Sequence, residues 1–593
     1  MRDVIVIGAG GGGPVVAKEL AAHGLDVLVL EAGPRHLRPE KEWRHLENEA
    51  NNPVTGYFRW GPADRSRSAW LRETPQNSFV WQLSGVGGTT QHYYGNCPRA
   101  VPGVFKGYEG RDRNHYDRAH EFPITYRTLV PYYEWVEHTL PVQTAAMGTK
   151  EETFLHGASK LGIPVQKTKD ATGAGYRPQE NAILQPHGTA GRTNDAKELV
   201  YPKARGCTFC GYCFQGCFEP RHAPRNLFAK RSTDNSYVPM ALTADAWSKG
   251  GKPVTLITDA FATKIGTTSS GGGKPVANSV TWRVGATGES VTEEAKVVVM
   301  AGGTTENPRL WLNSNLPNPN DWVGRGYTDH YFDWLIGVMP HYTGSSKGPG
   351  SSARVDYPGH GGLENVGLPP GLQTFSATFS DGGINDVYLN GHPKTPGVQG
   401  NGRRVGNALK RLVSDVDRLL NVLVITDDDV EAQNRVTLSN TLPPDEHGPI
   451  PKVEFHARNR TKRTHKNREF LVRKALKLLR NAGAKEVYRI NWPPLILHVQ
   501  STMRMGRDPK NSVLDAHCET RAVKRLFIAD NSALPNSLGG PNPTLTSQAL
   551  ATRTAETILV RYFGGERYVR HAKVNPVRSI DDRVTKAVLE RKL

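Results

Sequence analysis

The start of the chain carries the pattern that most restricts its fold: a short apolar run, a glycine-rich turn and a helical stretch. Val4 to Ile7 is a β-branched run typical of a buried parallel strand. Gly8 to Gly13 contain five glycines in six residues, and Pro14 to Ala22 has the composition of a helix. A strand, a glycine turn and a helix in this order open a doubly wound α/β domain. The sequence therefore predicts a dinucleotide-binding unit at this end.

Individual residues of this unit have separate expected roles. Gly8 permits the tight turn, Gly10 lets the backbone approach a pyrophosphate, and Gly13 lets the helix pack closely on the strand. A second strand, Asp26 to Leu30, ends at Glu31, 18 residues after Gly13. A carboxylate placed there accepts the ribose hydroxyls of an adenosine and repels a 2′-phosphate, so NADP is not expected. A glycine turn alone can be structural, but the strand, helix and acid at these spacings favour a cofactor site.

Composition limits the class of protein. Of 593 residues, 37% are hydrophobic and 22% are charged, as in ordinary globular proteins, and apolar runs are far shorter than the roughly 20 residues of a membrane span. The net charge is +18, with basic residues dense in Arg458 to Lys474 and in Arg567 to Lys592. No nucleic-acid motif accompanies them, and Lys477 and Arg480 continue the first cluster along a predicted amphipathic helix, which favours a solvated helix face. Because Met1 to Asp3 lead directly into the apolar run, no signal peptide is expected, and synthesis is expected in the cytoplasm.

Four further segments extend the N-terminal pattern along most of the chain. They are Ser84 to Thr90, Ala301 to Pro308, Val323 to His330 and a C-terminal block from His498 to Leu559. Together with the run after Glu31, these segments resemble, in order, the motifs of the glucose-methanol-choline (GMC) family of FAD-dependent oxidoreductases. This resemblance favours FAD over NAD.

The resemblance implies an α/β fold with an α+β substrate part. A Rossmann-like FAD-binding domain is expected in residues 1–99, 201–330 and 491–565, interleaved with an antiparallel-sheet substrate domain in 100–200 and 331–490, with a basic tail in 566–593. Residues 331–490 are expected to line the substrate pocket. Besides the N-terminal residues, the resemblance assigns cofactor contacts to Gly87, Gly88, His92, Asn96, Asp530, Asn531, Pro543 and Thr544.

The C-terminal block carries the residues expected to do the chemistry. Flavin-dependent alcohol oxidation removes a hydroxyl proton and a hydride, and a histidine titrates in the right range to take the proton. His498 falls where the family places that base, and Asn542 falls where the family has a second histidine or an asparagine. An asparagine amide would donate to the substrate oxygen without competing for the proton. The structural alternatives are a buried histidine that satisfies a backbone group and a helix-capping asparagine.

His92 raises a separate expectation. It resembles the position where some sugar-oxidising members attach the 8α-methyl group of the flavin to a histidine. Other members carry an unbonded histidine there, so covalent and non-covalent FAD both remain open.

Four of the six cysteines, Cys207, Cys210, Cys213 and Cys217, lie within eleven residues. Their C-x2-C-x2-C-x3-C spacing equals that of bacterial ferredoxins, although Pro220 comes three residues after the last cysteine instead of directly after it. Zinc-bound or free thiols and disulfides are the alternatives. The chain also resembles bacterial sugar dehydrogenases of the family that hold a cluster on C-x5-C-x3-C. Cys207, Cys213 and Cys217 have this spacing. With these three ligands the resemblance implies a [3Fe-4S] cluster, and Cys210 as a fourth ligand would allow a [4Fe-4S] cluster.

These resemblances lead to an expected function. We expect a sugar or glycoside dehydrogenase, such as a glucoside 3-dehydrogenase, that passes electrons through an iron-sulfur cluster to an external acceptor. Related enzymes work with a small subunit carrying a twin-arginine signal and with a c-type cytochrome, so the chain could reach the periplasm as a passenger. The first alternative is an oxidase of a sugar, a sterol or another bulky alcohol that makes hydrogen peroxide. A flavoprotein that only relays electrons is the second.

Overall fold

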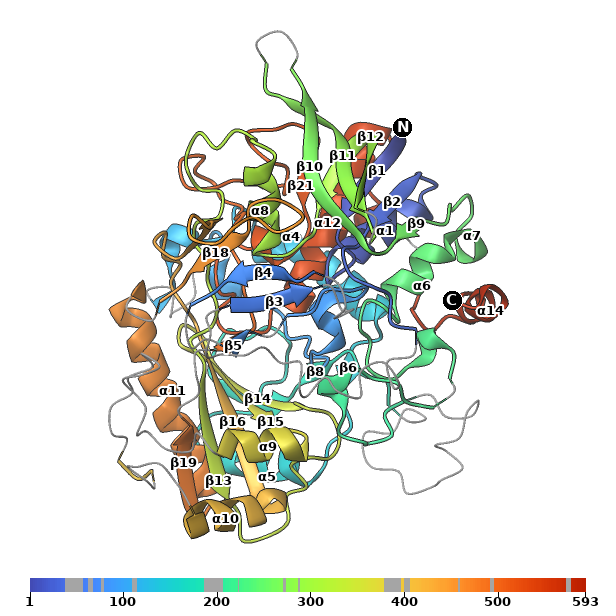
Figure 1. Ribbon diagram of the computed structural model, residues 1–593. Helices are drawn as coiled ribbons and strands as arrows, with labels where there is room; N and C mark the ends of the chain where they lie inside the picture. The colour runs from blue at the N-terminus through green and yellow to red at the C-terminus, as the bar shows by residue number, and fades with distance from the viewer. Residues whose placement is uncertain are drawn as a thin grey trace.

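The computed structural model of the chain describes residues 1–37, 57–61, 68–75, 79–80, 82–108, 115–185, 206–221, 223–269, 273–285, 288–377, 396–398, 406–456, 459–490, 495–571 and 577–593. Two large sheets lie at opposite ends of the molecule in the view of Figure 1. Strands from the N-terminal, central and C-terminal parts of the chain build the upper sheet, and strands between residues 175 and 490 build the lower one.

The upper sheet has the strand order β10-β11-β12-β1-β2-β9, with β21 paired to β12. β1 pairs in parallel with β2 on one side and with β12 on the other, and β21 is parallel to β12. The strands are β1 (Arg2–Ile7), β2 (Val27–Leu30), β9 (Thr255–Ile257), β10 (Ala260–Thr268), β11 (Val276–Val284), β12 (Glu289–Met300) and β21 (Leu526–Ile528). The predicted first two strands are confirmed, and their burial explains their unbroken apolar runs.

Helices pack beside this sheet and against each other. The predicted first helix is α1 (Gly13–Ala22), which packs on α12 (Thr544–Phe563) and α6 (Tyr237–Leu242). α12 also packs on α4 (Tyr126–Thr139), and it is buried along most of its length. Because α1 and α12 both begin at the same edge of the sheet, their two N-termini open toward one region of the molecule.

The lower sheet is antiparallel, with the order β19-β13-β16-β15-β14-β7. Its strands are β7 (Gly175–Pro178), β13 (Asp333–Val338), β14 (Ala353–Tyr357), β15 (Gly361–Val366), β16 (Leu419–Thr426) and β19 (Glu486–Ile490). α11 (Lys462–Asn481) and α5 (Thr149–Ser159) pack against the sheet and against each other. A second apolar cluster on this sheet includes residues of α9 (Pro370–Ala377) and α10 (Gly406–Ser414). The predicted fold class, a doubly wound domain joined to an antiparallel substrate sheet, is confirmed.

Smaller elements connect the two sheets. A four-stranded sheet has the order β17-β18-β4-β3 and joins residues near the N-terminus to residues after 430. The remaining elements are β3 (Tyr57–Gly61), β4 (Trp70–Glu73), β17 (Arg435–Leu438), β18 (Pro451–Glu454), the pair β5 (Phe79–Val80) and β20 (Leu495–Ile496), the pair β6 (Gln143–Thr144) and β8 (Glu180–Asn181), and the helices α7 (Ala244–Trp247) and α8 (Glu306–Asn313). The expected domain boundary at 200–201 lies outside the described residues, and the division into domains stays a prediction.

The basic C-terminal segment folds onto the body of the protein. It forms α13 (Tyr568–His571) and α14 (Asp582–Arg591), and α14 lies beside α6 and α7 in Figure 1. Val584 and Val588 pack on Met240, and Arg591 forms an ion pair with Asp245 at 2.9 Å. The other basic cluster lies largely on α11, as predicted, although Arg458 is outside the described residues. None of the helices in the described part of the chain is long and apolar enough to cross a membrane.

Candidate active site

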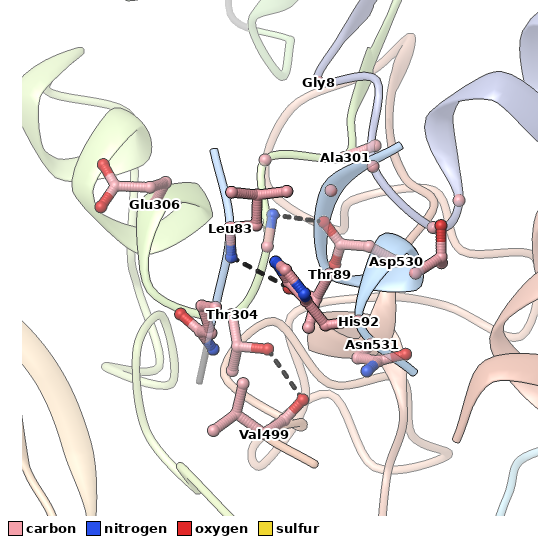
Figure 2. A pocket seen from close by; sticks show the side chains of 18 of the residues that line it. Gly8, Leu83, Thr89, His92, Ala301, Thr304, Glu306, Val499, Asp530 and Asn531 are labelled. Carbon is pink, nitrogen blue, oxygen red and sulfur yellow. Dashed lines mark hydrogen bonds between the residues drawn. The ribbon is translucent and has the colours of Figure 1, made fainter. Parts of the chain in front are cut away.

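One elongated cavity connects the glycine-rich turn to the lower sheet, and Figure 2 shows part of its lining. Of the predicted site residues, the cavity is lined by Gly8, Gly10, Glu31, Gly88, His92, Asn96, His498, Asp530, Asn531, Asn542, Pro543 and Thr544. Gly13 and Gly87 do not line it, but Gly13 packs against Gly8 and the Gly87 oxygen accepts from Thr233. The structure thus brings residues from both ends of the chain to a single site.

The glycine-rich turn is held by contacts that exclude side chains. Gly8 has φ +103°, and a Cβ there would lie 2.3 Å from the carbonyl oxygen of Ala301. A Cβ on Gly13 would lie 2.0 Å from the Gly8 oxygen. Gly12 has an equally strict requirement that the sequence did not single out, because its Cβ would lie 1.6 Å from the Ala529 oxygen. At Gly10, by contrast, the nearest atom would be 3.9 Å away, so this position borders open space where a pyrophosphate can approach.

Glu31 closes the far end of this turn. Its carboxylate accepts hydrogen bonds from the backbone N–H of Ala9 at 2.8 Å and of Gly33 at 2.9 Å. Burial nevertheless raises the pKa of Glu31, since a carboxylate loses hydration there. The side chain lines the cavity after the second strand, the position expected for an acid that binds ribose hydroxyls.

A second glycine loop faces the first. Gly87 and Gly88 have φ of +100° and +48°, and a Cβ on Gly88 would lie 2.8 Å from the Cα of Gly10. Thr233 connects the two loops, since its hydroxyl lies 2.9 Å from the Gly10 oxygen and 3.2 Å from the Gly87 oxygen. Gln548 of α12 also donates to the Gly11 oxygen at 3.3 Å. The backbone of both loops is therefore fixed beside the start of two helices, which suits an anionic ligand.

Asp530 joins three separate segments beneath the cavity. Its carboxylate accepts hydrogen bonds from the Gly303 N–H and the Asn307 amide, both at 2.8 Å, and from the Ser532 N–H at 2.8 Å. Figure 2 shows Asp530 next to Ala301 and Asn531. Thr304 donates to the Val499 oxygen at 3.0 Å, which ties the loop after β12 to the segment that carries His498.

His498 lies where the cavity reaches the lower sheet. Its backbone N–H and that of Leu497 both donate to the buried carboxylate of Asp329, at 2.9 and 2.8 Å. Burial raises the pKa of Asp329 to about 7. The His498 ring lies against Phe332, and its Nδ1 is 2.9 Å from Nδ1 of His330. Burial, with a smaller effect of His330, holds the pKa of His498 well below 6.5, so its ring is neutral at neutral pH.

Asn542 faces a buried charged network on the lower sheet. α12 begins at Thr544, and no side chain caps its start, so Asn542 does not have the capping role considered for it. Instead Asn542 donates to the carboxylate of Glu364, which also accepts from Asn96 at 3.0 Å and pairs with Arg354 at 2.9 Å. Burial raises the pKa of Glu364 despite these donors. Glu364 lines the cavity on β15.

The cavity wall beyond His498 and Asn542 is largely apolar among the described residues. Glu364 and Asn96 are polar groups of this part of the wall, and its apolar side chains come from the lower sheet, α9 and neighbouring loops: Tyr94, Phe214, Trp334, Val366, Leu368, Leu372, Leu423 and Leu497. This wall comes largely from residues 331–490. Such a surface suits a substrate that presents an apolar face and few polar groups.

The cysteine segment lies next to this cavity. The four thiols line one small buried space, and all six cysteines of the chain are free. Two sulfur atoms accept backbone hydrogen bonds at 3.4 Å, Cys207 from Phe209 and Cys217 from Lys230. Within the described residues, however, no group of three or more His, Cys, Asp and Glu side chains is arranged to hold a metal ion. The expected metal site is therefore not established by this arrangement.

Lys230 links the cysteine segment to the cavity, and no sequence motif marks it. Its buried ammonium group donates to the carbonyl oxygens of Gln91 at 2.6 Å, Tyr93 at 2.8 Å and Cys213 at 2.5 Å. The neighbouring carbonyl of Phe214 lies 2.8 Å from Nδ1 of His92, whose pKa burial lowers to about 4. The Lys230 ammonium group and the hydrogen bond between His92 and the Phe214 carbonyl thus connect the loop around His92 to the cysteine segment.

Asp329, His330, Glu364 and Arg354 were not among the site residues expected from the sequence. Asp329 and His330 end the segment Val323 to His330, which was expected only as a family motif. Glu364 and Arg354 lie on antiparallel strands without a local motif, so only the fold brings them to Asn542.

The chain is similar to known proteins over most of its length. Models of the GMC oxidoreductase family match residues 177–332 and 430–551. 2-Methyl-1,2-propanediol dehydrogenase of Mycolicibacterium austroafricanum is 26% identical over 94% of this chain and 95% of its own. Paromamine 6′-oxidase of Streptomyces fradiae is 25% identical over 94% and 91%, and the fructose dehydrogenase large subunit of Gluconobacter japonicus is 24% identical over 94% and 97%.

The fold is also similar to that of a solved structure. The crystal structure of pyridoxine 4-oxidase from Mesorbium loti matches 95% of this chain and 100% of its own, with a TM-score of 0.58 and 15% sequence identity. At this identity the match supports the architecture and not the substrate.

Proposed function

We propose that the chain is a member of the GMC oxidoreductase family, whose models match two of its segments, and that it oxidises an alcohol group of a sugar, a glycoside or a similar alcohol with His498 as the base. The observation that carries the proposal is that His498 and Asn542 line one cavity together with both glycine loops. The open position at Gly10 and the two helix starts fit the pyrophosphate of FAD. When bound, FAD supplies the acceptor for the hydride that leaves the alcohol carbon.

The protein's own residues perform the proton transfer. The neutral ring of His498 takes the hydroxyl proton, which its lowered pKa allows across the neutral range. One amide hydrogen of Asn542 is used by Glu364, and the second donates to the substrate oxygen. The hydrogen bonds from Leu497 and His498 to Asp329 hold the backbone of the base in place.

Replacing the base tests this function. His498→Ala should slow flavin reduction by substrate about 10²- to 10⁴-fold, the usual contribution of a general base, while FAD stays bound. Stopped-flow absorbance measures the rate, and His156→Ala, on an exposed turn of α5, is the matched control. Reduction of His498→Ala at the control rate would remove His498 from the mechanism.

The substrate class divides into two candidates. The relatives that oxidise paromamine and fructose support a sugar or glycoside. The apolar wall formed by side chains such as Trp334 and Leu423 supports a bulky alcohol such as a sterol. A panel of sugars, glycosides, sterols and aliphatic alcohols with an artificial electron acceptor decides between them.

For the acceptor, the proposal is a dehydrogenase whose electrons leave through an iron-sulfur cluster on Cys207, Cys210, Cys213 and Cys217. Four free thiols around one buried space and two backbone donors to sulfur support it. Burial raises the pKa values of Cys207, Cys210 and Cys213, so without a bound metal these thiols would stay protonated. A cluster would carry electrons singly to a further acceptor.

Iron and acid-labile sulfide in protein purified without air test the cluster. Visible absorbance that survives removal of the flavin should accompany them, whereas zinc or metal-free protein would refute the cluster. Hydrogen peroxide produced in proportion to substrate under air would favour the oxidase alternative. A covalent bond through His92 is a further part of the proposal, and flavin released completely by acid would exclude it.

The wider assembly also remains part of the proposal. One relative is named as a large subunit, which supports a small signal-bearing partner that would carry this chain to the periplasm, with a c-type cytochrome as the acceptor. Co-expression with such a subunit and fractionation of the cells would test it.

A further inference from the structure

The ring of His330 stands between the base and a fixed carbonyl group. Its Nδ1 lies 2.9 Å from Nδ1 of His498, and its Nε2 lies 2.9 Å from the carbonyl oxygen of Ser537. His330 is fully buried, so both of its ring nitrogens face protein and not solvent. Each nitrogen therefore has one defined partner.

These partners determine where the hydrogens lie. A carbonyl oxygen only accepts, so Nε2 of His330 must carry the hydrogen in that contact. Nδ1 of the neutral ring is then an acceptor, and the hydrogen between the two rings must belong to Nδ1 of His498. His498 consequently has its hydrogen on Nδ1, and its Nε2 is left unprotonated.

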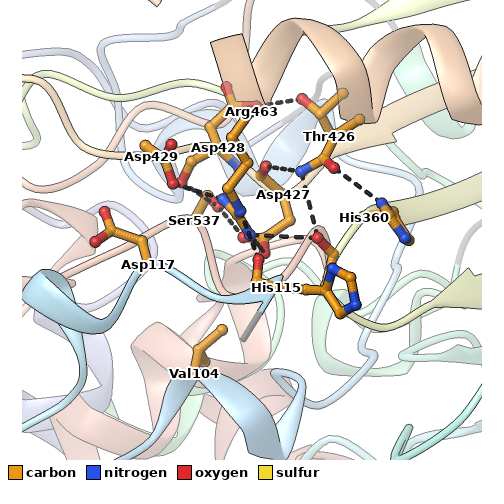
Figure 3. Close-up of polar contacts among 12 residues, drawn as sticks. Val104, His115, Asp117, His360, Thr426, Asp427, Asp428, Asp429, Arg463 and Ser537 are labelled. Atoms are coloured by element: carbon orange, nitrogen blue, oxygen red, sulfur yellow. Dashed lines mark hydrogen bonds and ion pairs between the residues drawn. The ribbon is translucent and has the colours of Figure 1, made fainter. Parts of the chain in front are cut away.

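Ser537, whose carbonyl oxygen accepts from His330, is held by hydrogen bonds of its side chain. The Ser537 hydroxyl donates to the Asp427 carboxylate at 2.9 Å and accepts from the Asp428 N–H at 2.7 Å. Asp427 and Asp429 in turn pair with Arg463, both at 2.5 Å, as Figure 3 shows. These contacts hold the Ser537 side chain in place beside the carbonyl that faces His330.

This arrangement of hydrogens requires a neutral His330, and the surroundings of the ring favour that form. Burial lowers its pKa to about 4, and the nearby guanidinium groups of Arg460 and Arg354 add to this effect. The carboxylates of Asp329 and Asp428 lie near Arg460 and partly offset its charge. A cationic His330 would donate to His498 instead and leave the hydrogen on the wrong nitrogen of the base.

We propose that His330 is a positioning residue that fixes the Nδ1–H tautomer of His498, so that Nε2 is the atom that takes the substrate proton. This inference rests on the proposed function of His498 but assigns the role to a residue that need not touch the substrate. We call the hydrogen bonds from His498 through His330 to the Ser537 carbonyl the relay. The relay sets the tautomer of His498, and no proton has to move along it.

Three substitutions at one position test the relay. In His330→Asn the amide oxygen occupies roughly the place of Nδ1 and can accept from His498, whereas His330→Gln reaches toward Ser537 and His330→Leu offers neither contact. The Leu and Gln variants should reduce flavin at least about 10-fold more slowly at saturating substrate, with FAD content unchanged, because free rotation admits the wrong tautomer. The Asn variant should recover most of the rate.

The relative flavin-reduction rates of the three variants distinguish a positioning role of His330 from a purely structural one. Gln as fast as the wild type, or Asn as slow as Leu, would overturn the proposal. If the Leu variant does not fold, the comparison of Asn with Gln decides alone. If His498→Ala reduces flavin normally, the proposed function fails; if it is inactive while all His330 variants are fast, only the relay fails.

A direct measurement of the tautomer needs no turnover. In FAD-loaded protein labelled with ¹⁵N-histidine, the His498 signals are those absent from the spectrum of His498→Ala. We expect a protonated Nδ1 and an unprotonated Nε2 in the wild type, and a mixture in His330→Leu. A protonated Nε2 in the wild type would refute the proposal.

Discussion

Burial favours the neutral forms of His92 and His498 in the cavity and of His330 beside His498, since it lowers the pKa of His92 and His330 to about 4 and that of His498 well below 6.5. A base must be unprotonated to act, so the rate of proton abstraction by His498 falls only as the pH drops through the lowered pKa of His498. The rate constant for flavin reduction should therefore stay level from pH 8 to below about 6.5, the ordinary histidine pKa. Stopped-flow measurements across this range check it, and an acid limb centred near 6.5 or above would contradict it.

The glycine-rich turn supplies a matched pair of substitutions. Gly12→Ala would place a Cβ 1.6 Å from the Ala529 oxygen, so α1 could not keep its position against β21. Gly10→Ala meets nothing closer than 3.9 Å in the protein. We expect soluble, folded Gly10→Ala protein that has lost most of its FAD, and misfolded or insoluble Gly12→Ala. Flavin content and circular dichroism distinguish the two, and full FAD in Gly10→Ala would remove that residue from the cofactor site.

At the scale of elements, Lys230 fastens the cysteine segment to the loop that carries His92. Lys230→Met would leave three buried carbonyl oxygens without their donor, so the free energy of unfolding should fall by at least about 2 kcal/mol. Urea denaturation measures this loss, and Lys264→Met, at an exposed position of β10, is the control. Equal stability of the two variants would show that the link is dispensable.

Elements with a local pattern were predictable, and contacts between distant elements were not. The apolar runs and glycine turn gave β1, α1 and β2, and apolar spacing gave α11, because periodicity reflects which side of an element is buried. The motif around His498 could suggest a base, but its partner His330 is 168 residues away. Glu364 reaches Asn542 only because β15 lies in the middle of the lower sheet. The cysteine spacing predicted a metal site, yet spacing does not determine how the thiols converge in space.

At the scale of the whole molecule, the cofactor cavity crosses from the upper sheet to the lower one. A ligand bound there stabilises both parts by mass action, by about 2.7 kcal/mol at a concentration 100 times its Kd. Removal of FAD should therefore lower the Tm, and added FAD should restore it in a concentration-dependent way. Differential scanning calorimetry checks both, and a Tm indifferent to FAD would contradict a shared cavity.

The strand order of the upper sheet also has a consequence for biosynthesis. β1, β12 and β21 lie side by side, yet β21 begins only at Leu526. At about 5 to 20 residues per second, the ribosome needs roughly half a minute to two minutes to reach β21 after making β1. From the time β12 is made until β21 follows, the apolar end of β12 lacks its last neighbour, a state that invites chaperones. Cofactor loading is expected later still, because Asn542 and the start of α12 are made after β21.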